Sequence, residues 1–229
     1  MIVNHDNYYD KDSSTFKEMA RRSLRENWPS ALFVMAVTTL LGTLLGPNTH
    51  WIVDIALFLF SGALMLSSVH YFLRLHRNER AEISDLLYGF NQLIPSTLTY
   101  LLFLLFILLW TLLLIIPGII AGLRYAMTFY ILNDEPDIKP HQAIKRSSEM
   151  MKGHKWNFFK LQLSFIGWYL LGIIAGFITI AALPYVQMND PYWSGLIIAL
   201  FTLPVLTYTA AATAAFYENL KAMQQGEQV

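Results

Sequence analysis

The sequence has 229 residues, of which 55% are hydrophobic and 14% are charged, and its formal net charge at pH 7 is zero. Soluble domains are about 45–50% apolar and about 25% charged, so this composition indicates a membrane protein. Because cysteine is absent, disulfides, thiol catalysis and cysteine metal sites are excluded.

A basic amphipathic helix is predicted before the first apolar run, over residues 15–28. Its apolar residues Phe16, Ala20 and Leu24 recur at helical spacing, whereas its basic residues mostly face elsewhere. A helix of this kind that leads into a span is typical of the membrane interface. The leading segment is too long and too polar for a cleaved signal peptide, so we expect the first span to be retained.

Six apolar runs follow, and each is interpreted as a membrane-spanning helix. The third run, 97–116, has 20 residues without a charge, whereas the fourth is short. Two further amphipathic helices are predicted, one before the third run and one before the fifth. The six runs are 30–45, 51–73, 97–116, 119–132, 156–182 and 194–217.

A reversal of the chain is predicted between the third and fourth runs, at Pro117 and Gly118. A single helix over 95–132 would be roughly 55 Å long, much more than the ~30 Å of a bilayer core. Proline removes a backbone donor and glycine permits a sharp reversal, so the pair predicts a hairpin corner.

The distribution of lysine and arginine predicts six spans with both termini in the cytoplasm. With a hairpin at 95–132, 15 of the 16 basic residues lie on one side of the membrane. Cytoplasmic segments of membrane proteins carry this excess of positive charge. The expected fold is therefore all-α: a polytopic bundle of six spans with three interfacial helices, forming a single membrane domain over 1–229.

An interfacial helix followed by a two-span hairpin occurs three times, at 15–73, 82–132 and 140–217. The first and third copies also share a sequence pattern, since residues 20–23 are Ala-Arg-Arg-Ser and residues 143–147 are Ala-Ile-Lys-Arg-Ser. All three copies enter the membrane from the same side. We therefore predict parallel repeats, in contrast to the inverted repeats of many secondary transporters.

Arg124 is the candidate functional residue, because a cation inside a span is costly and faces the bundle interior or snorkels to the interface. Asp54, one turn into the second span, is its expected partner. Two interpretations stay open. Arg124 forms a structural ion pair or snorkels, or it binds an anionic ligand such as a lipid phosphate.

Three GxxxG patterns provide candidate helix-packing residues, since small residues let helices approach closely in lipid. They favour packing within one subunit, with a homodimer interface as the alternative. The residues are Gly42 and Gly46, Gly118 and Gly122, and Gly172 and Gly176.

No motif for catalysis, metal binding or cofactor binding occurs in the sequence. There is no HExxH, no pair of histidines four residues apart, no GxSxG, no Walker loop and no pair of acids inside a span. We therefore expect no enzyme activity, catalytic residue, metal or cofactor. The basic inner face has no nucleic-acid-binding pattern, so we expect anionic lipid of the inner leaflet as its partner.

Three segments, IPGIIAGLRYAMTFYILNDEP, AIKRSSEMMKGHKW and FFKLQLSFIGW, resemble the bacterial membrane-protein family called domain of unknown function 975. The resemblance covers nearly the whole chain, includes the amino-terminal ARRSLRENW element, and is strongest over 116–168. It implies a multi-pass plasma-membrane protein, typical of Gram-positive bacteria, without an established activity.

These observations predict a non-enzymatic plasma-membrane protein that binds lipid or a membrane partner. Its role would lie in envelope maintenance or in protection against membrane-active peptides. The alternative is a transporter or permease-like subunit in which Arg124 lines a polar path.

Overall fold

The computed structural model describes residues 12–43, 51–183 and 191–226, and these residues form helices without a strand. Each of the three predicted repeats contains a short helical element followed by two longer helical segments. The first contains α2 (Ser13–Leu24), α3 (Trp28–Thr43) and α4 (Trp51–His76). The second contains η1 (Ile83–Leu87), α5 (Tyr88–Asn91), α6 (Leu93–Leu113), α7 (Ile115–Tyr125) and α8 (Thr128–Asp134). The third contains α9 (Pro140–Met150), α10 (Lys155–Ala182) and α11 (Pro191–Gly226).

Five described helical segments are long and apolar enough to cross a membrane: Leu57–His76, Leu93–Leu113, Ile115–Asp134, Lys155–Ala182 and Trp193–Gly226. The other predicted span lies in α3, which has 16 residues. At about 1.5 Å per residue, α3 is about 24 Å long, less than the roughly 30 Å of a hydrocarbon core. The sixth span, the cytoplasmic termini and the repeat relationship stay predictions.

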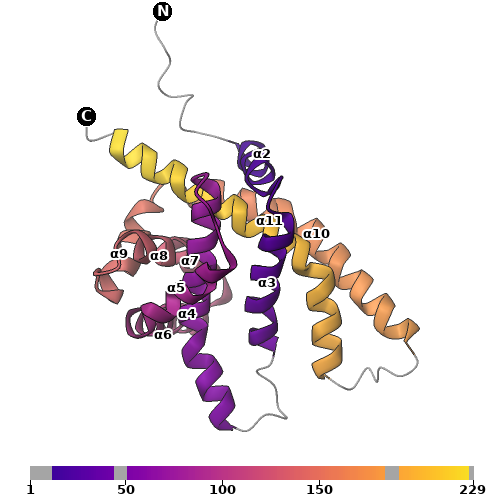
Figure 1. Cartoon of the computed structure of the whole chain (residues 1–229). Helices are drawn as coiled ribbons and strands as arrows, with labels where there is room; N and C mark the ends of the chain where they lie inside the picture. Colours follow the sequence, from indigo (N-terminus) through magenta and orange to yellow (C-terminus); the bar gives the residue numbers. More distant parts are fainter. Residues whose placement is uncertain (1–11, 44–50, 184–190, 227–229) are drawn as a thin grey trace, which may run out of the picture.

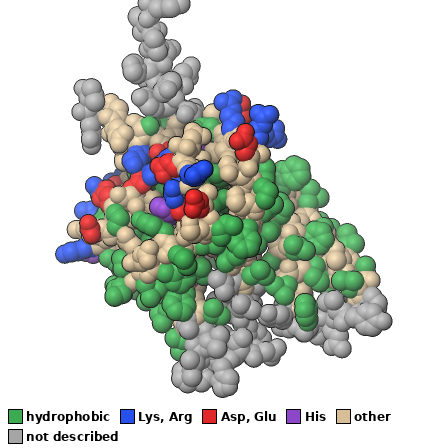
Figure 2. Space-filling model, in the orientation of Figure 1, with side chains coloured by type: hydrophobic (Ala, Val, Ile, Leu, Met, Phe, Trp, Pro, Cys, Tyr) green, Lys and Arg blue, Asp and Glu red, His purple; other side chains and the backbone are tan. Residues whose placement is uncertain are grey.

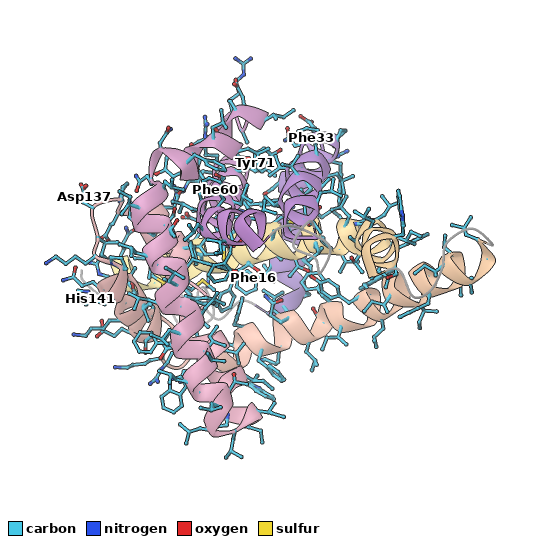
Figure 3. The ribbon with its side chains drawn as sticks, turned by 90° about the horizontal axis from the view of Figure 1, so that it is seen from below. Phe16, Phe33, Phe60, Tyr71, Asp137 and His141 are labelled. Carbon is cyan, nitrogen blue, oxygen red and sulfur yellow. The ribbon has the colours of Figure 1, made fainter. Side chains whose placement is uncertain are left out.

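The three hairpins α3–α4, α6–α7 and α10–α11 extend from a shared centre in different directions (Figure 1). In the view from below, the helix that carries Phe60, α4, is seen along its axis, whereas α6 lies across it (Figure 3). The described helices therefore do not form a single parallel bundle.

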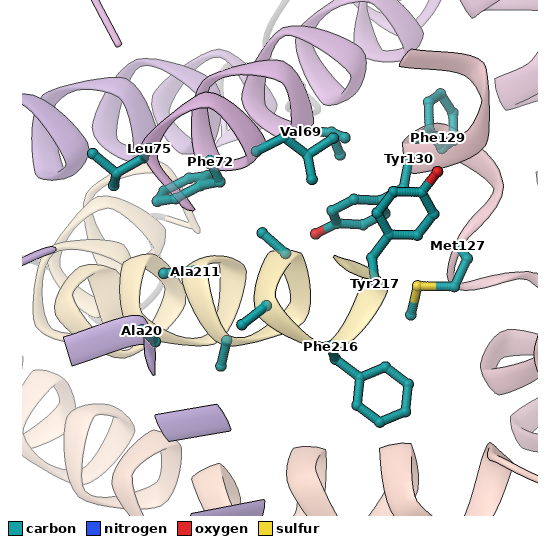
Figure 4. Packing of buried hydrophobic residues seen from close by; sticks show 14 of the residues in the cluster. Ala20, Val69, Phe72, Leu75, Met127, Phe129, Tyr130, Ala211, Phe216 and Tyr217 are labelled. Carbon is teal, nitrogen blue, oxygen red and sulfur yellow. The ribbon is translucent and has the colours of Figure 1, made fainter. Parts of the chain in front are cut away.

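The shared centre, which we call the hub, is the buried cluster where α2, α4, α8 and α11 meet. Tyr217 of α11 packs on Tyr130 of α8 at a ring-centroid distance of 5.1 Å, whereas the neighbouring Phe216 points to the opposite side of α11 (Figure 4). The ring of Phe216 also contacts Phe16 of α2 at a centroid distance of 5.0 Å. Apolar side chains from all three predicted repeats thus form one core.

Away from the hub, the hairpins expose their apolar side chains. Residues 112–116, around the tip of the α6–α7 hairpin, are 67–82% exposed. Charged side chains instead gather where the helices meet, and hydrophobic side chains cover the hairpins (Figure 2). Because a bilayer core accepts apolar side chains and excludes charges, the hairpins have the surface expected of membrane-embedded helices.

The reversal between α6 and α7 lies at Leu114, which has an extended backbone (φ −166°, ψ 152°), and not at Pro117 and Gly118 as predicted. Proline is tolerated in a first helical turn, where its missing N–H removes no hydrogen bond, so α7 begins before Pro117. This earlier start makes Ile115–Asp134 a segment of 20 residues, so the fourth apolar segment is not short.

The apolar faces of two of the short helices pack on the protein itself. Phe16, Ala20 and Leu24 of α2 are buried, and so are Ala143 and Ile144 of α9. These faces are consequently not available to lipid.

The second predicted short helix, formed by η1 and α5, differs from α2 and α9 because it buries a charged side chain and exposes apolar ones. Its Asp85 is buried and accepts a hydrogen bond from Arg74 at 2.5 Å, whereas Ile83 and Leu87 are 50% and 63% exposed. The charge is thus inside and the apolar stripe outside. Of the three short elements, this one presents its apolar stripe to the surroundings.

Candidate functional site

Arg124 lies in the last turn of α7, near the middle of the apolar segment Ile115–Asp134. Its Nε atom is buried and has no hydrogen-bond partner within the part of the chain that the structure describes. The residue as a whole is only partly buried. Arg124 is therefore a cation without a described carboxylate partner.

The backbone around Arg124 is fixed by Ser147 of α9. The Ser147 hydroxyl donates to the carbonyl oxygen of Arg124 at 3.0 Å and accepts from the N–H of Met127 at 3.1 Å. One hydroxyl can do both, so it satisfies backbone groups on either side of the break between α7 and α8. This contact holds the polar helix α9 against the chain at Arg124.

The predicted partner of Arg124, Asp54, belongs to the first turn of α4, but its side chain lies outside the described part of the structure. The Arg124–Asp54 pair therefore stays a prediction. The surroundings of Gly42 at the end of α3, and the whole of Gly46, also lie outside the described residues.

Three of the predicted packing glycines lie where two helices approach closely. A Cβ atom on Gly118 would lie 2.3 Å from Oγ1 of Thr111, across the α6–α7 hairpin. A Cβ on Gly172 or Gly176 would lie 3.0 Å from an atom of α11. Gly122 differs, because a Cβ there would have nothing within 4 Å.

Two further close approaches were missed by the sequence reasoning, because Gly62 and Gly89 belong to no GxxxG pattern. A Cβ on Gly62 would lie 2.5 Å from the carbonyl oxygen of Ser96, and one on Gly89 would lie 1.9 Å from that of Ala63. The Gly89 N–H also donates to Ser67 Oγ at 2.9 Å. These glycines join α4 to α5 and α6.

A network of ion pairs links the end of α4 to α8 and α11 beside the hub. This network was not predicted from the sequence. The Arg77 guanidinium donates to Asp134 at 2.8 and 3.0 Å and to Glu218 at 2.6 and 2.9 Å. Asp134 also accepts from Lys221 at 2.5 Å and from the Tyr217 hydroxyl at 3.0 Å. Arg77, which directly follows α4, thus bridges Asp134 of α8 and Glu218 of α11.

The electrostatics of this network keep Arg77 charged. Burial alone lowers the pKa of the guanidinium, but the hydrogen bonds and negative charges of Asp134 and Glu218 more than offset that effect. The pKa of Arg77 is consequently raised above its ordinary value. The network therefore has a permanent cation at its centre.

His70 lies beside the same network and is held by three groups. Its ring stacks on Tyr88 at a centroid distance of 3.7 Å, and its Nδ1 is 2.8 Å from Oδ1 of Asn133. Its Nε2 lies 4.0 Å from a carboxylate oxygen of Asp85. Contacts from three elements therefore fix the orientation of His70.

A polar cavity of about 620 Å³ lies between α8, α9 and α11 and shares Asp134, Tyr217 and Lys221 with the network. The charged groups that line it are already paired within the chain: Asp134 with Lys221, Glu135 with Arg146, and Glu149 with Lys145. No set of three or more potential metal ligands is present among the described residues. Arg124 differs from the charges of this cavity because none of the described carboxylates pairs with it.

The fold and surface define an all-helical protein with several helices suited to a membrane. The family model described as "Protein of unknown function (DUF975)" matches residues 8–120 and 111–224, and the chain belongs to this family. Comparisons with curated proteins and with solved structures gave no significant match.

Proposed function

We propose that the protein is a non-enzymatic, multi-pass protein of the bacterial plasma membrane that binds lipid or a membrane partner. The observation that carries this proposal is the division of its surface, with charged groups around the hub and exposed apolar side chains along the hairpins. Residues 112–116 and the exposed face of α10 offer large apolar areas to lipid or to a partner helix. Within this proposal, the physiological role is envelope maintenance or protection against membrane-active peptides.

A second candidate function is supported by Arg124 alone. A cation inside an apolar helical segment, here without a partner in the described part of the chain, is typical of residues that line polar pathways, so a transporter or permease-like subunit is the alternative. In that case purified protein in liposomes would carry solute flux, and Arg124→Gln would reduce that flux.

Native mass spectrometry of the full chain released from lipid nanodiscs tests the proposed function. We expect the wild-type protein to appear with retained lipid, or as a discrete oligomer, because the exposed apolar surface needs a partner in the membrane. A bare monomer would contradict the binding function. Robust solute flux by the purified protein alone would contradict it in favour of transport.

A further inference from the structure

We propose that Arg124 and the outward isoleucines of α7 form a binding site for one anionic phospholipid, whose headgroup phosphate pairs with the guanidinium. The proposal rests on the membrane location proposed above. It goes further in naming the site, the ligand class and the residue that recognises the headgroup.

The first argument is that the Arg124 guanidinium has no ion-pair partner among the described residues. Its Nε is buried without a hydrogen-bond partner among the described residues, and the side chain as a whole is only partly buried. Buried polar groups in native proteins are almost always hydrogen-bonded, so an orphaned N–H of a charged group points to a ligand. The planar guanidinium presents donors that match the oxygens of a phosphate, often two at once.

The second argument is the apolar row that leads to Arg124. Ile116, Ile120 and Arg124 are spaced by four residues on α7, so they lie on one side of that helix. Ile116 is 71% exposed and Ile120 is 46% exposed. An acyl chain along this row would place the lipid's polar end next to the guanidinium.

The third argument is the charged helix α9 that lies beside Arg124. Ser147 holds α9 against Arg124, and α9 exposes the basic residues Lys145 and Arg146. Arg124 therefore lies at the boundary between the apolar surface of α7 and a charged helix. A phospholipid likewise joins apolar acyl chains to a charged phosphate, so the neighbouring apolar and basic side chains complement an anionic phospholipid.

The test compares lipid binding by matched variants of the full chain. Detergent-solubilised protein is titrated with phosphatidylglycerol or with phosphatidylcholine of the same acyl chains, and bound lipid is counted by native mass spectrometry. We expect Arg124→Gln to weaken phosphatidylglycerol binding by about tenfold or more, the loss expected for a charge-assisted hydrogen bond. Arg124→Lys keeps the charge and should retain part of the preference. Arg25→Gln removes one exposed charge from the region after α2 and should change binding less than about twofold, as screened surface charges do.

A second measurement uses only wild-type protein and so does not depend on the folding of a variant. Phosphatidylglycerol with a photoreactive acyl chain should label the peptide that contains Ile116 and Ile120 more strongly than the apolar face of α10. Equal labelling of both helices would overturn the site.

The remaining outcomes separate the possible ligands and the two proposals. Displacement of phosphatidylglycerol by millimolar inorganic phosphate would show that the guanidinium takes a soluble anion, and would overturn the lipid assignment. If the wild-type protein and the Arg124→Gln variant bind phosphatidylglycerol equally well, the proposed site is overturned. The proposed function is not affected by that outcome. Wild-type protein that retains no lipid of either kind and appears as a bare monomer would overturn both.

Discussion

Replacing Asp134 with asparagine is expected to lower the free energy of unfolding by about 3 kcal/mol, the usual cost of breaking a buried ion pair by removing one partner. The Asp134 side chain is only 12% exposed and accepts hydrogen bonds from Arg77, Tyr217 and Lys221. Without its charge, Lys221 loses its carboxylate and Arg77 keeps only Glu218. Unfolding in mixed micelles, followed by tryptophan fluorescence, measures the change.

The control for this prediction is Glu149→Gln. Glu149 pairs with Lys145 at 4.0 Å within α9, and both side chains are at least half exposed. Exposed pairs of this kind contribute roughly 0–1 kcal/mol, so the control should unfold almost as the wild type does. Equal loss of stability in the two variants would show that the network does not join the helices as described.

Replacing Gly89 with alanine is expected to destabilise the protein by about 1–3 kcal/mol, the usual cost of inserting a group into a packed contact. The new Cβ would lie 1.9 Å from the carbonyl oxygen of Ala63. Because that oxygen belongs to the backbone of α4, the contact cannot be relieved by a side-chain rotation. α5 would have to move away from α4 and weaken the hydrogen bond between Gly89 and Ser67.

Gly167 provides the matched control, because a Cβ at this position of α10 would have nothing within 4 Å. Alanine favours a helix over glycine by about 1 kcal/mol, so Gly167→Ala should be neutral or stabilising. The measurement is the thermal midpoint of the purified protein in detergent. A Gly89→Ala variant as stable as the wild type would contradict the close packing of α4 on α5.

The positions of the long helices could be predicted from the sequence because hydropathy and helical periodicity are local signals. The runs at 51–73, 97–116 and 156–182 correspond to α4, α6 and α10. The corner at Pro117 and Gly118 was placed three residues too late because proline and glycine were interpreted as a break. Proline in a first turn is equally compatible with the start of a helix.

The contacts between distant segments could not be predicted from the sequence. Arg77 and Glu218 are 141 residues apart, so no local sequence pattern links them. Periodicity shows that α2 and α9 have an apolar face but not whether protein or lipid covers it. The reversed orientation of η1 and α5 depends on Asp85 meeting Arg74, which hydropathy does not reveal.

Cysteine accessibility provides a direct test of the prediction that the chain crosses the membrane six times with both termini in the cytoplasm. Because the sequence has no cysteine, single-cysteine variants can be labelled in intact bacterial cells with a membrane-impermeant maleimide. We expect cysteines at Thr49 and Gln187 to react from outside, whereas those at Glu79, Lys152 and Gln225 should react only after permeabilisation. Labelling of Glu79 or Lys152 in intact cells would contradict this prediction.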